Sequence, residues 1–189
     1  MAEQPIIAFA SASAFRRWLK ANHAAHPGIW MQIAKKDSDH ASITYAEALD
    51  EALCFGWIDG QKKRFDDQSW LQKFTKRDPR SVWSKTNVGH VERLAREGRL
   101  TPAGLAAVEG AKAQGRWATA YEGARTAEMP PDFMAALAKH NQAKAFFETL
   151  NKTNRYAIYF RVTTAKKPQT RAKRIADLVA LLGRGEKLH

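Results

Sequence analysis

The chain has 189 residues and a formal net charge of +12, with 44% hydrophobic residues. Its length fits one domain, or one domain with a helical appendage. Its hydrophobic content excludes wholesale disorder. Its single cysteine excludes an internal disulfide and a cysteine-rich zinc site. The basic balance predicts a polyanionic partner: nucleic acid, anionic lipid or an acidic ligand.

The N-terminal residues have no basic segment before the short apolar run at 6–10, which is unlike a signal peptide. No run approaches the ~20 apolar residues that a transmembrane helix needs. Together with the single thiol, these features predict a cytoplasmic location and no transmembrane segment. Ser11 or Ser13 caps a first helix extending to about residue 22, and a strand is predicted at residues 29–35.

The central helix is predicted from a capping box, in which Thr44 and Glu47 each satisfy a free backbone N–H of the other. Apolar residues recur at helical spacing after it, and Gly56 stands where a helix ends in a left-handed residue. Trp57 begins an alternating basic strand. Turn residues at 66–68 then lead into a second alternating strand, so we expect a β-hairpin.

The rest of the chain is predicted to be helical. One helix opens within the stretch 82–85, a second covers residues 102–114 after the Thr101-Pro102 start, and four more fill the last 58 residues. An irregular connector at 116–131 suggests a division into residues 1–128 and 129–189. We therefore predict an α+β fold, with a small, mostly antiparallel sheet flanked by helices and an all-helical C-terminal unit.

The hairpin region supplies a first candidate binding site. Tryptophan and basic side chains together recognise anions through cation–π and bidentate contacts, although a half-buried sheet with one charged face has the same pattern. The candidate ligand-binding residues are Trp57, Asp59, Lys62, Arg64, Trp83 and Lys85.

No catalytic residues are assigned. Cys54 lies on the apolar stripe of its helix near the C-terminal end, where burial and the helix dipole disfavour a reactive thiolate, so we expect a buried, inert thiol. Asp59 has no second carboxylate at a recognisable spacing, so a turn or hydrogen-bonding role is expected. The sequence leaves enzymatic activity open and favours a protein that is not an enzyme.

The C-terminal segment supplies the second candidate site. Residues 151–189 contain ten lysine and arginine residues against two acidic ones. This density predicts a polyanion-binding face with Tyr156 and Tyr159 as stacking groups, and is equally typical of a solvated helix face. The candidate polyanion-binding residues are Arg161, Lys166, Lys167, Arg171, Lys173 and Arg174.

Metal and cofactor motifs are not found. The six histidines lack the spacing of metal ligands, and the glycines at 56 and 60 lack the Gly-Lys-Ser/Thr of a phosphate loop, so neither a metal nor a cofactor is predicted. The histidines are His23, His26, His40, His90, His140 and His189.

The sequence resembles the YdeI/OmpD-associated family. The similarity lies in residues 44–60, 74–77, 81–87 and 143–150 and in a C-terminal stretch that reads Ala165-Lys166-Lys167-Pro168-Gln169-Thr170-Arg171-Ala172-Lys173-Arg174-Ile175. The resemblance covers nearly the whole chain. It implies a bacterial bacteriocin-protecting protein, linked to resistance to cationic antimicrobial peptides, with a porin partner and a periplasmic location. It implies no catalytic residues.

Three hypotheses follow. The first is a cytoplasmic stress or peptide-resistance protein, not an enzyme, that binds an anionic partner; a charge of +12 repels cationic peptides rather than sequestering them. The second is a small-molecule-binding protein or enzyme with a pocket near Trp57, Asp59 and Trp83. The third is protection at the cell envelope through a porin.

Overall fold

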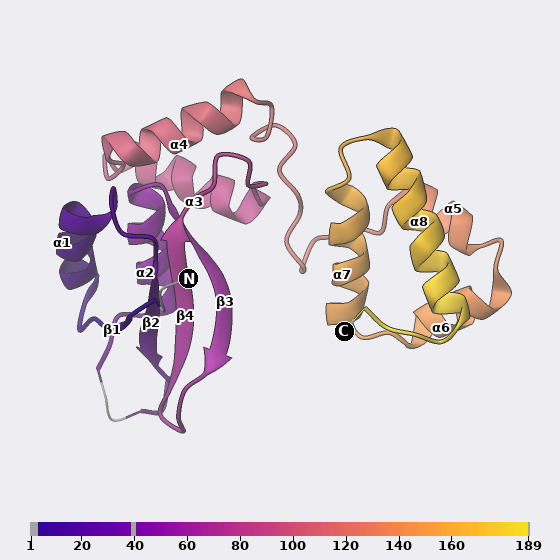
Figure 1. Ribbon diagram of the computed structural model, residues 1–189, viewed down its shortest axis with the longest axis horizontal. Coiled ribbons are helices and arrows are strands. Elements are labelled where there is room, and N and C mark those ends of the chain that lie inside the picture. The colour runs from indigo at the N-terminus through magenta and orange to yellow at the C-terminus, as the bar shows by residue number, and fades with distance from the viewer. Residues whose placement is uncertain (1–3, 39–40, 189) are drawn as a thin grey trace. The chain divides into compact units, whose positions relative to one another are not determined.

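The computed structural model describes residues 4–38 and 41–188 (Figure 1). Its contacts divide the chain into two units. The sheet unit comprises Met1–Ser81 and Asn87–Thr119, and the helical unit comprises Val82–Thr86 and Ala120–His189. The sheet lies in the first unit and a set of helices makes up most of the second, which confirms the predicted α+β class.

The sheet has four strands in the order β1-β2-β4-β3. They are β1 (Ile6–Ala8), β2 (Ile29–Ala34), β3 (Trp57–Arg64) and β4 (Ser69–Lys76). β2 pairs with β4 and β4 with β3 in antiparallel orientation, whereas β1 runs parallel to β2. The mostly antiparallel sheet is therefore confirmed. β1 was not predicted, because three residues are too few to show the alternation that identifies a strand.

Helices α1 (Ala12–Asn22) and α2 (Tyr45–Cys54) pack on one face of this sheet, as Figure 1 shows. Burial alternates along β2, so that Ile29, Met31 and Ile33 face the core. The ring of Phe15 in α1 lies 5.9 Å from that of Phe74 in β4. The hydrophobic core of the sheet unit therefore forms between this face and the two helices.

The capping box of α2 is confirmed. Thr44 accepts a hydrogen bond on Oγ1 from the backbone N–H of Glu47 at 3.3 Å, and the Glu47 carboxylate accepts one from the Thr44 N–H at 2.9 Å. At the other end, Gly56 has φ of 70°, a left-handed conformation that favours glycine. The predicted end of α2 at Gly56 therefore determines that β3 begins at the next residue, Trp57.

Helices α3 (Lys85–Arg96) and α4 (Pro102–Ala113) follow the hairpin. Of the stretch 82–85 predicted to open α3, only Lys85 is helical, because Ser84 forms a parallel bridge with Tyr121 and the helix starts after it. The side chain of Thr101 caps α4 and donates to the carbonyl of Cys54 at 2.7 Å. This bond ties α4 to the end of α2.

The helical unit contains α5 (Pro131–Leu137), α6 (Asn141–Thr149), α7 (Lys152–Thr163) and α8 (Pro168–Gly183), close to the four predicted helices. α8 contacts each of the other three (Figure 1). Side chains from all four helices form one apolar cluster, whose buried members are Phe133, Leu137, Ala143, Phe147, Leu150, Ile158, Val162, Ile175, Leu178, Val179 and Leu182.

Candidate functional site

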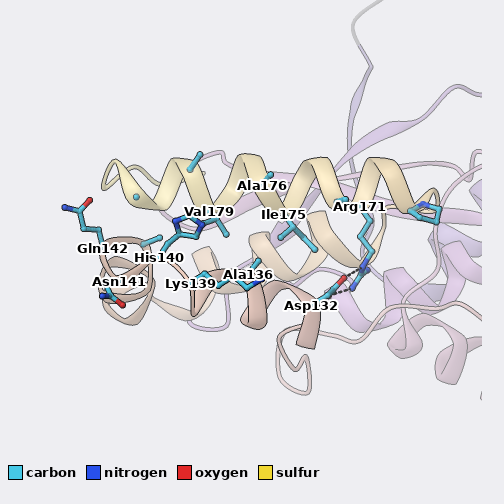
Figure 2. A pocket seen from close by; sticks show the side chains of 15 residues that line it. Asp132, Ala136, Lys139, His140, Asn141, Gln142, Arg171, Ile175, Ala176 and Val179 are labelled. Carbon is cyan, nitrogen blue, oxygen red and sulfur yellow. Dashed lines mark hydrogen bonds and ion pairs between the residues drawn. The ribbon is translucent and has the colours of Figure 1, made fainter.

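A groove of about 960 Å³ runs along the helical unit between α8 on one side and α5 and the start of α6 on the other (Figure 2). Its lining is largely apolar, with a charged pair at one end and polar side chains at the other. Groove volumes of this size are typical of ligand sites. The lining residues are Asp132, Ala136, Lys139, His140, Asn141, Gln142, Ala143, Pro168, Arg171, Ala172, Ile175, Ala176, Val179, Ala180 and Gly183.

One face of α8 forms an entire wall of the groove. The lining positions repeat every three or four residues from Pro168 to Gly183, which is the spacing of one helix face over the full length of the helix. Ala172, Ala176 and Ala180 are exposed along this wall. Their small side chains let another backbone approach α8 closely.

Arg171 closes one end of the groove. It makes a bidentate pair with Asp132 in α5, through Nε to Oδ2 at 2.6 Å and Nη2 to Oδ1 at 2.8 Å (Figure 2). Its Nη1 donates to the carbonyl of Val162 at 3.1 Å. The hydrogen bonds and charge of Arg171 lower the pKa of the Asp132 carboxyl. The pair therefore joins three helices and holds this end of the groove in shape.

The other end of the groove is polar and open. Lys139 and His140 are exposed in the turn between α5 and α6, and Figure 2 shows Asn141 and Gln142 beside them. Within residues 4–38 and 41–188, no carboxylate pairs with Lys139. This end therefore presents an unneutralised positive charge next to an apolar floor.

The predicted polyanion-binding residues do not all present free charge. Arg174 donates from Nη1 to the carbonyl of Arg161 at 2.7 Å, and Lys173 pairs with Asp177 at 3.0 Å, one turn further along α8. Arg171 is engaged with Asp132 as described. Lys166 and Lys167 are exposed just before α8. The structure thus brings Arg171 and Arg174 to the C-terminal carbonyls of α7, where cations stabilise the helix dipole.

Four of the predicted hairpin residues lie in the sheet unit. Trp57 is fully buried, and its indole N–H donates to the carbonyl of His23 at 3.0 Å. Asp59 accepts a hydrogen bond from the hydroxyl of Tyr45 at 2.8 Å, which confirms a hydrogen-bonding role. Burial, and then the charge of Asp59, raise the pKa of Tyr45. Lys62 and Arg64 are exposed near the end of β3.

These two basic side chains have partners on the hairpin itself. The ammonium of Lys62 lies 5.8 Å from the ring of Trp70, and Arg64 pairs with Asp67 in the turn. Trp83 and Lys85 belong to the helical unit, where Trp83 is buried and Lys85 pairs with Glu122. The six predicted residues are therefore divided between the two units, and a common pocket remains a prediction.

The groove was missed by the sequence analysis, although α8 carried a signal. Alanines at every fourth position along an amphipathic helix indicate a flat second face, but only the facing residues of α5 and α6 turn that face into a groove. Those residues lie some 30 positions away in the chain, which periodicity within one helix does not reveal.

Cys54 is buried, as predicted, and burial is the main cause that raises the pKa of its thiol. In the part of the chain that the structure describes, no three histidine, cysteine, aspartate or glutamate side chains gather as metal ligands. His40 and His189 lie outside that part. No helix there is both long enough and apolar enough to cross a membrane.

Two family models match the chain. Residues 7–107, more than half of the sequence, match a model described as a domain of unknown function, DUF8412. Residues 126–185 match a model described as bacteriocin-protection, YdeI or OmpD-associated. This second match contains every residue that lines the groove. No curated protein and no solved structure matches the chain.

Proposed function

Since the chain belongs to the family of the domain of unknown function that matches residues 7–107, and carries a bacteriocin-protection, YdeI or OmpD-associated domain at residues 126–185, we propose that it is a protective binding protein rather than an enzyme. Its partner is an anionic protein segment. The groove along α8 receives the apolar face of an acidic amphipathic helix of that partner.

The shape of the groove supports an elongated occupant. Its α8 wall spans sixteen residues, about 24 Å at the rise of an α-helix. A compact metabolite fills only part of such a length, whereas a helix of about four and a half turns fills all of it. An amphipathic helix lying in an apolar groove is a recurring mode of peptide recognition. The exposed alanines are the single observation on which this proposal most depends.

The charge of the helical unit supports an acidic partner. Residues 120–189 contain thirteen lysine and arginine residues and six aspartate and glutamate residues. Lys139 stands at the open end of the groove, and Arg171 is already neutralised by Asp132. Complementary charge around an apolar contact speeds association and rejects partners of the same sign. Cationic helices are therefore excluded by the same surface.

A titration with designed peptides tests this function. A labelled sixteen-residue peptide with leucines on one face and glutamates on the other is compared by fluorescence anisotropy with a lysine counterpart of the same leucine pattern. We expect saturable binding of the acidic peptide by the full-length protein and at least tenfold weaker binding of the basic one. Equal binding of both peptides contradicts the proposal.

A matched pair of variants locates the binding surface. Ala176→Glu places a bulky negative charge on the groove wall, whereas Ala145→Glu places the same residue on an exposed position of α6 that does not line the groove. We expect Ala176→Glu to weaken binding of the acidic peptide at least tenfold, about 1.4 kcal/mol, and Ala145→Glu to leave it within twofold. If both variants bind alike, the groove is not the site.

A small-molecule site is the second candidate, because the side chains of four residues of α2, β3 and β4 lie close together. These residues are Tyr45, Asp59, Lys62 and Trp70. The Tyr45 and Trp70 rings lie 6.1 Å apart, with the Asp59 carboxylate beside one and the Lys62 ammonium beside the other. Quenching of Trp70 fluorescence by small anionic ligands, lost in Trp70→Phe, tests it. The absence of quenching by any of them excludes this candidate.

The cellular location decides between two routes of protection. A cytoplasmic protein is our proposal, whereas the family description also names association with OmpD. Fractionation of cells that express the natural gene, with a cytoplasmic and a periplasmic marker enzyme, separates them. Recovery with the cytoplasmic marker alone excludes a direct porin partner, and recovery with the periplasmic marker contradicts the cytoplasmic proposal.

A further inference from the structure

A second, smaller cavity lies on the helical unit, apart from the groove. It measures about 250 Å³ and lies between the connecting segment 124–129 and the first two turns of α7. Three basic side chains line it: Arg125, Lys152 and Arg155. No aspartate or glutamate belongs to its lining. A cavity lined by three cations and no carboxylate attracts anions.

Two tyrosines fix the wall of this cavity. The hydroxyl of Tyr156 donates to the carbonyl of Glu122 at 3.2 Å, and the hydroxyl oxygen of Tyr159 accepts from the Glu122 N–H at 2.9 Å. The two rings stack with centroids 5.7 Å apart. These two bonds to Glu122, which lies just before the connecting segment, hold both tyrosines in the cavity wall.

The side chain of Arg155 is held in place by two contacts, and one of its nitrogens makes no hydrogen bond to the residues that the structure describes. Its Nη2 donates to the carbonyl of Glu148 at 2.8 Å, and its guanidinium lies 5.2 Å from the ring centre of Phe147. Its Nε is buried and has no hydrogen-bond partner among the described residues. Because this Nε is out of reach of an outside ligand, Arg155 meets an anion in the cavity through the terminal nitrogens of its guanidinium.

We propose that this cavity binds the phosphate group of a small phosphorylated ligand. A phosphate dianion offers three terminal oxygens, enough for the guanidiniums of Arg125 and Arg155 and the ammonium of Lys152 at once, whereas a carboxylate offers two. The volume accommodates a phosphate with a small organic group attached. None of the cavity residues lines the groove, so this site stands whether or not the groove binds a helix.

The test uses phosphorus NMR and calorimetry on the full-length protein, with inorganic phosphate and a nucleoside monophosphate as probes at constant ionic strength. We expect saturable binding of one or both. Tighter binding of the nucleoside monophosphate identifies an organic phosphate as the ligand, and equal binding identifies the phosphate group alone. If neither probe saturates, the site is overturned.

A matched pair of double variants separates this site from general attraction to a basic protein. Arg125→Gln with Lys152→Gln removes two charges from the cavity, and Lys166→Gln with Lys167→Gln removes two charges from exposed positions outside it. All four side chains are exposed, so neither double variant threatens the fold. We expect at least tenfold weaker phosphate binding in the first and less than twofold change in the second. Equal weakening in both overturns the proposal.

Discussion

The two units use arginine in different ways. In the sheet unit, the carboxylate of Glu51 is only 5% exposed and receives two guanidiniums, Arg16 at 2.7 Å and Arg99 at 2.8 Å. In the helical unit, Arg171 pairs with Asp132, a residue on the surface, and donates from Nη1 to the carbonyl of Val162 at the end of α7. One arrangement is buried in a core, and the other lies along a groove.

This difference shows where binding is to be expected. In the sheet unit, the buried carboxylate of Glu51 orders the two arginines around it, and the carboxylate of Asp50 pairs with Arg93 and lies at hydrogen-bond distance from the ring of His90. In the helical unit, an apolar cluster holds the helices together, so cations such as Lys139 and Lys152 are not needed for its packing. Charges that the fold does not use are available to the partner that we propose.

The largest effect is expected from Glu51→Gln. The change removes the negative charge that two partly buried arginines share, and breaking a buried pair by removing one partner costs about 3 kcal/mol. We expect the free energy of unfolding of the sheet unit, measured by urea denaturation and circular dichroism, to fall by about this amount.

Glu109→Gln is the matched control, because Glu109 and Lys112 form an exposed pair on α4. Exposed pairs contribute little, so we expect a loss of about 0.5 kcal/mol or less. Equal losses in the two variants contradict the view that the buried carboxylate organises this unit.

Two glycines of α4 provide the second prediction, again on the packing of the sheet unit. A Cβ on Gly104 would overlap the carbonyl oxygen of Cys54 at the end of α2, whereas a Cβ on Gly110 would meet nothing within 4 Å. We expect Gly104→Ala to destabilise by about 2 kcal/mol through overpacking. We expect Gly110→Ala to stabilise by about 0.5–1 kcal/mol, since alanine favours a helix interior.

Thermal or urea unfolding of both variants measures this contrast. Because the two substitutions add the same methyl group to the same helix, their difference reports the close contact between α4 and α2 alone. Stabilisation by both would show that α4 does not pack as closely as described.

Much of the fold was predictable because its signals are local. The capping box at Thr44, the left-handed Gly56 and the turn residues after Arg64 each fix an element boundary within a few residues of chain. β1 failed because its identity depends on pairing with β2, some twenty residues away. The start of α3 could not be placed more closely than residues 82–85 for the same reason, since Ser84 bridges to Tyr121.

The candidate site was less predictable. Charge and composition indicated that the C-terminal segment is basic, but not that Arg174 and Arg171 are directed at carbonyls of α7. The spacing of apolar residues identified the buried face of α8, but it did not reveal that residues of α5 and α6 face its alanines. Trp57 is a further example: a tryptophan beside basic residues suggested a pocket, but the local sequence does not reveal that its side chain is fully buried.

The third prediction concerns Thr44→Ala, which removes the cap of α2. The side chain accepts from the Glu47 N–H, and losing such a cap costs about 1 kcal/mol. Thr44→Ser keeps a hydroxyl and is expected to lose a few tenths of a kcal/mol at most. Chemical denaturation of both variants checks this, and a loss of the same size in Thr44→Ser would show that the methyl group, not the hydroxyl, matters.

The smallest effect is expected from Asp132→Asn, which tests the exposed arrangement. Since pairing with Arg171 lowers the folded-state pKa of Asp132 below its unfolded value of about 3.9, its contribution is fully present above that value. This contribution to the free energy of unfolding is lost as the pH falls through the pKa that Asp132 has in the folded protein. With side chains 30% and 47% exposed, the pair contributes about 0.5–1 kcal/mol at neutral pH. We therefore expect the urea midpoints of the native protein and the variant to differ at pH 7 and to converge at acidic pH, once the Asp132 carboxyl is protonated in the folded state. A difference that stays constant with pH would mean that the carboxylate charge does not stabilise the helical unit.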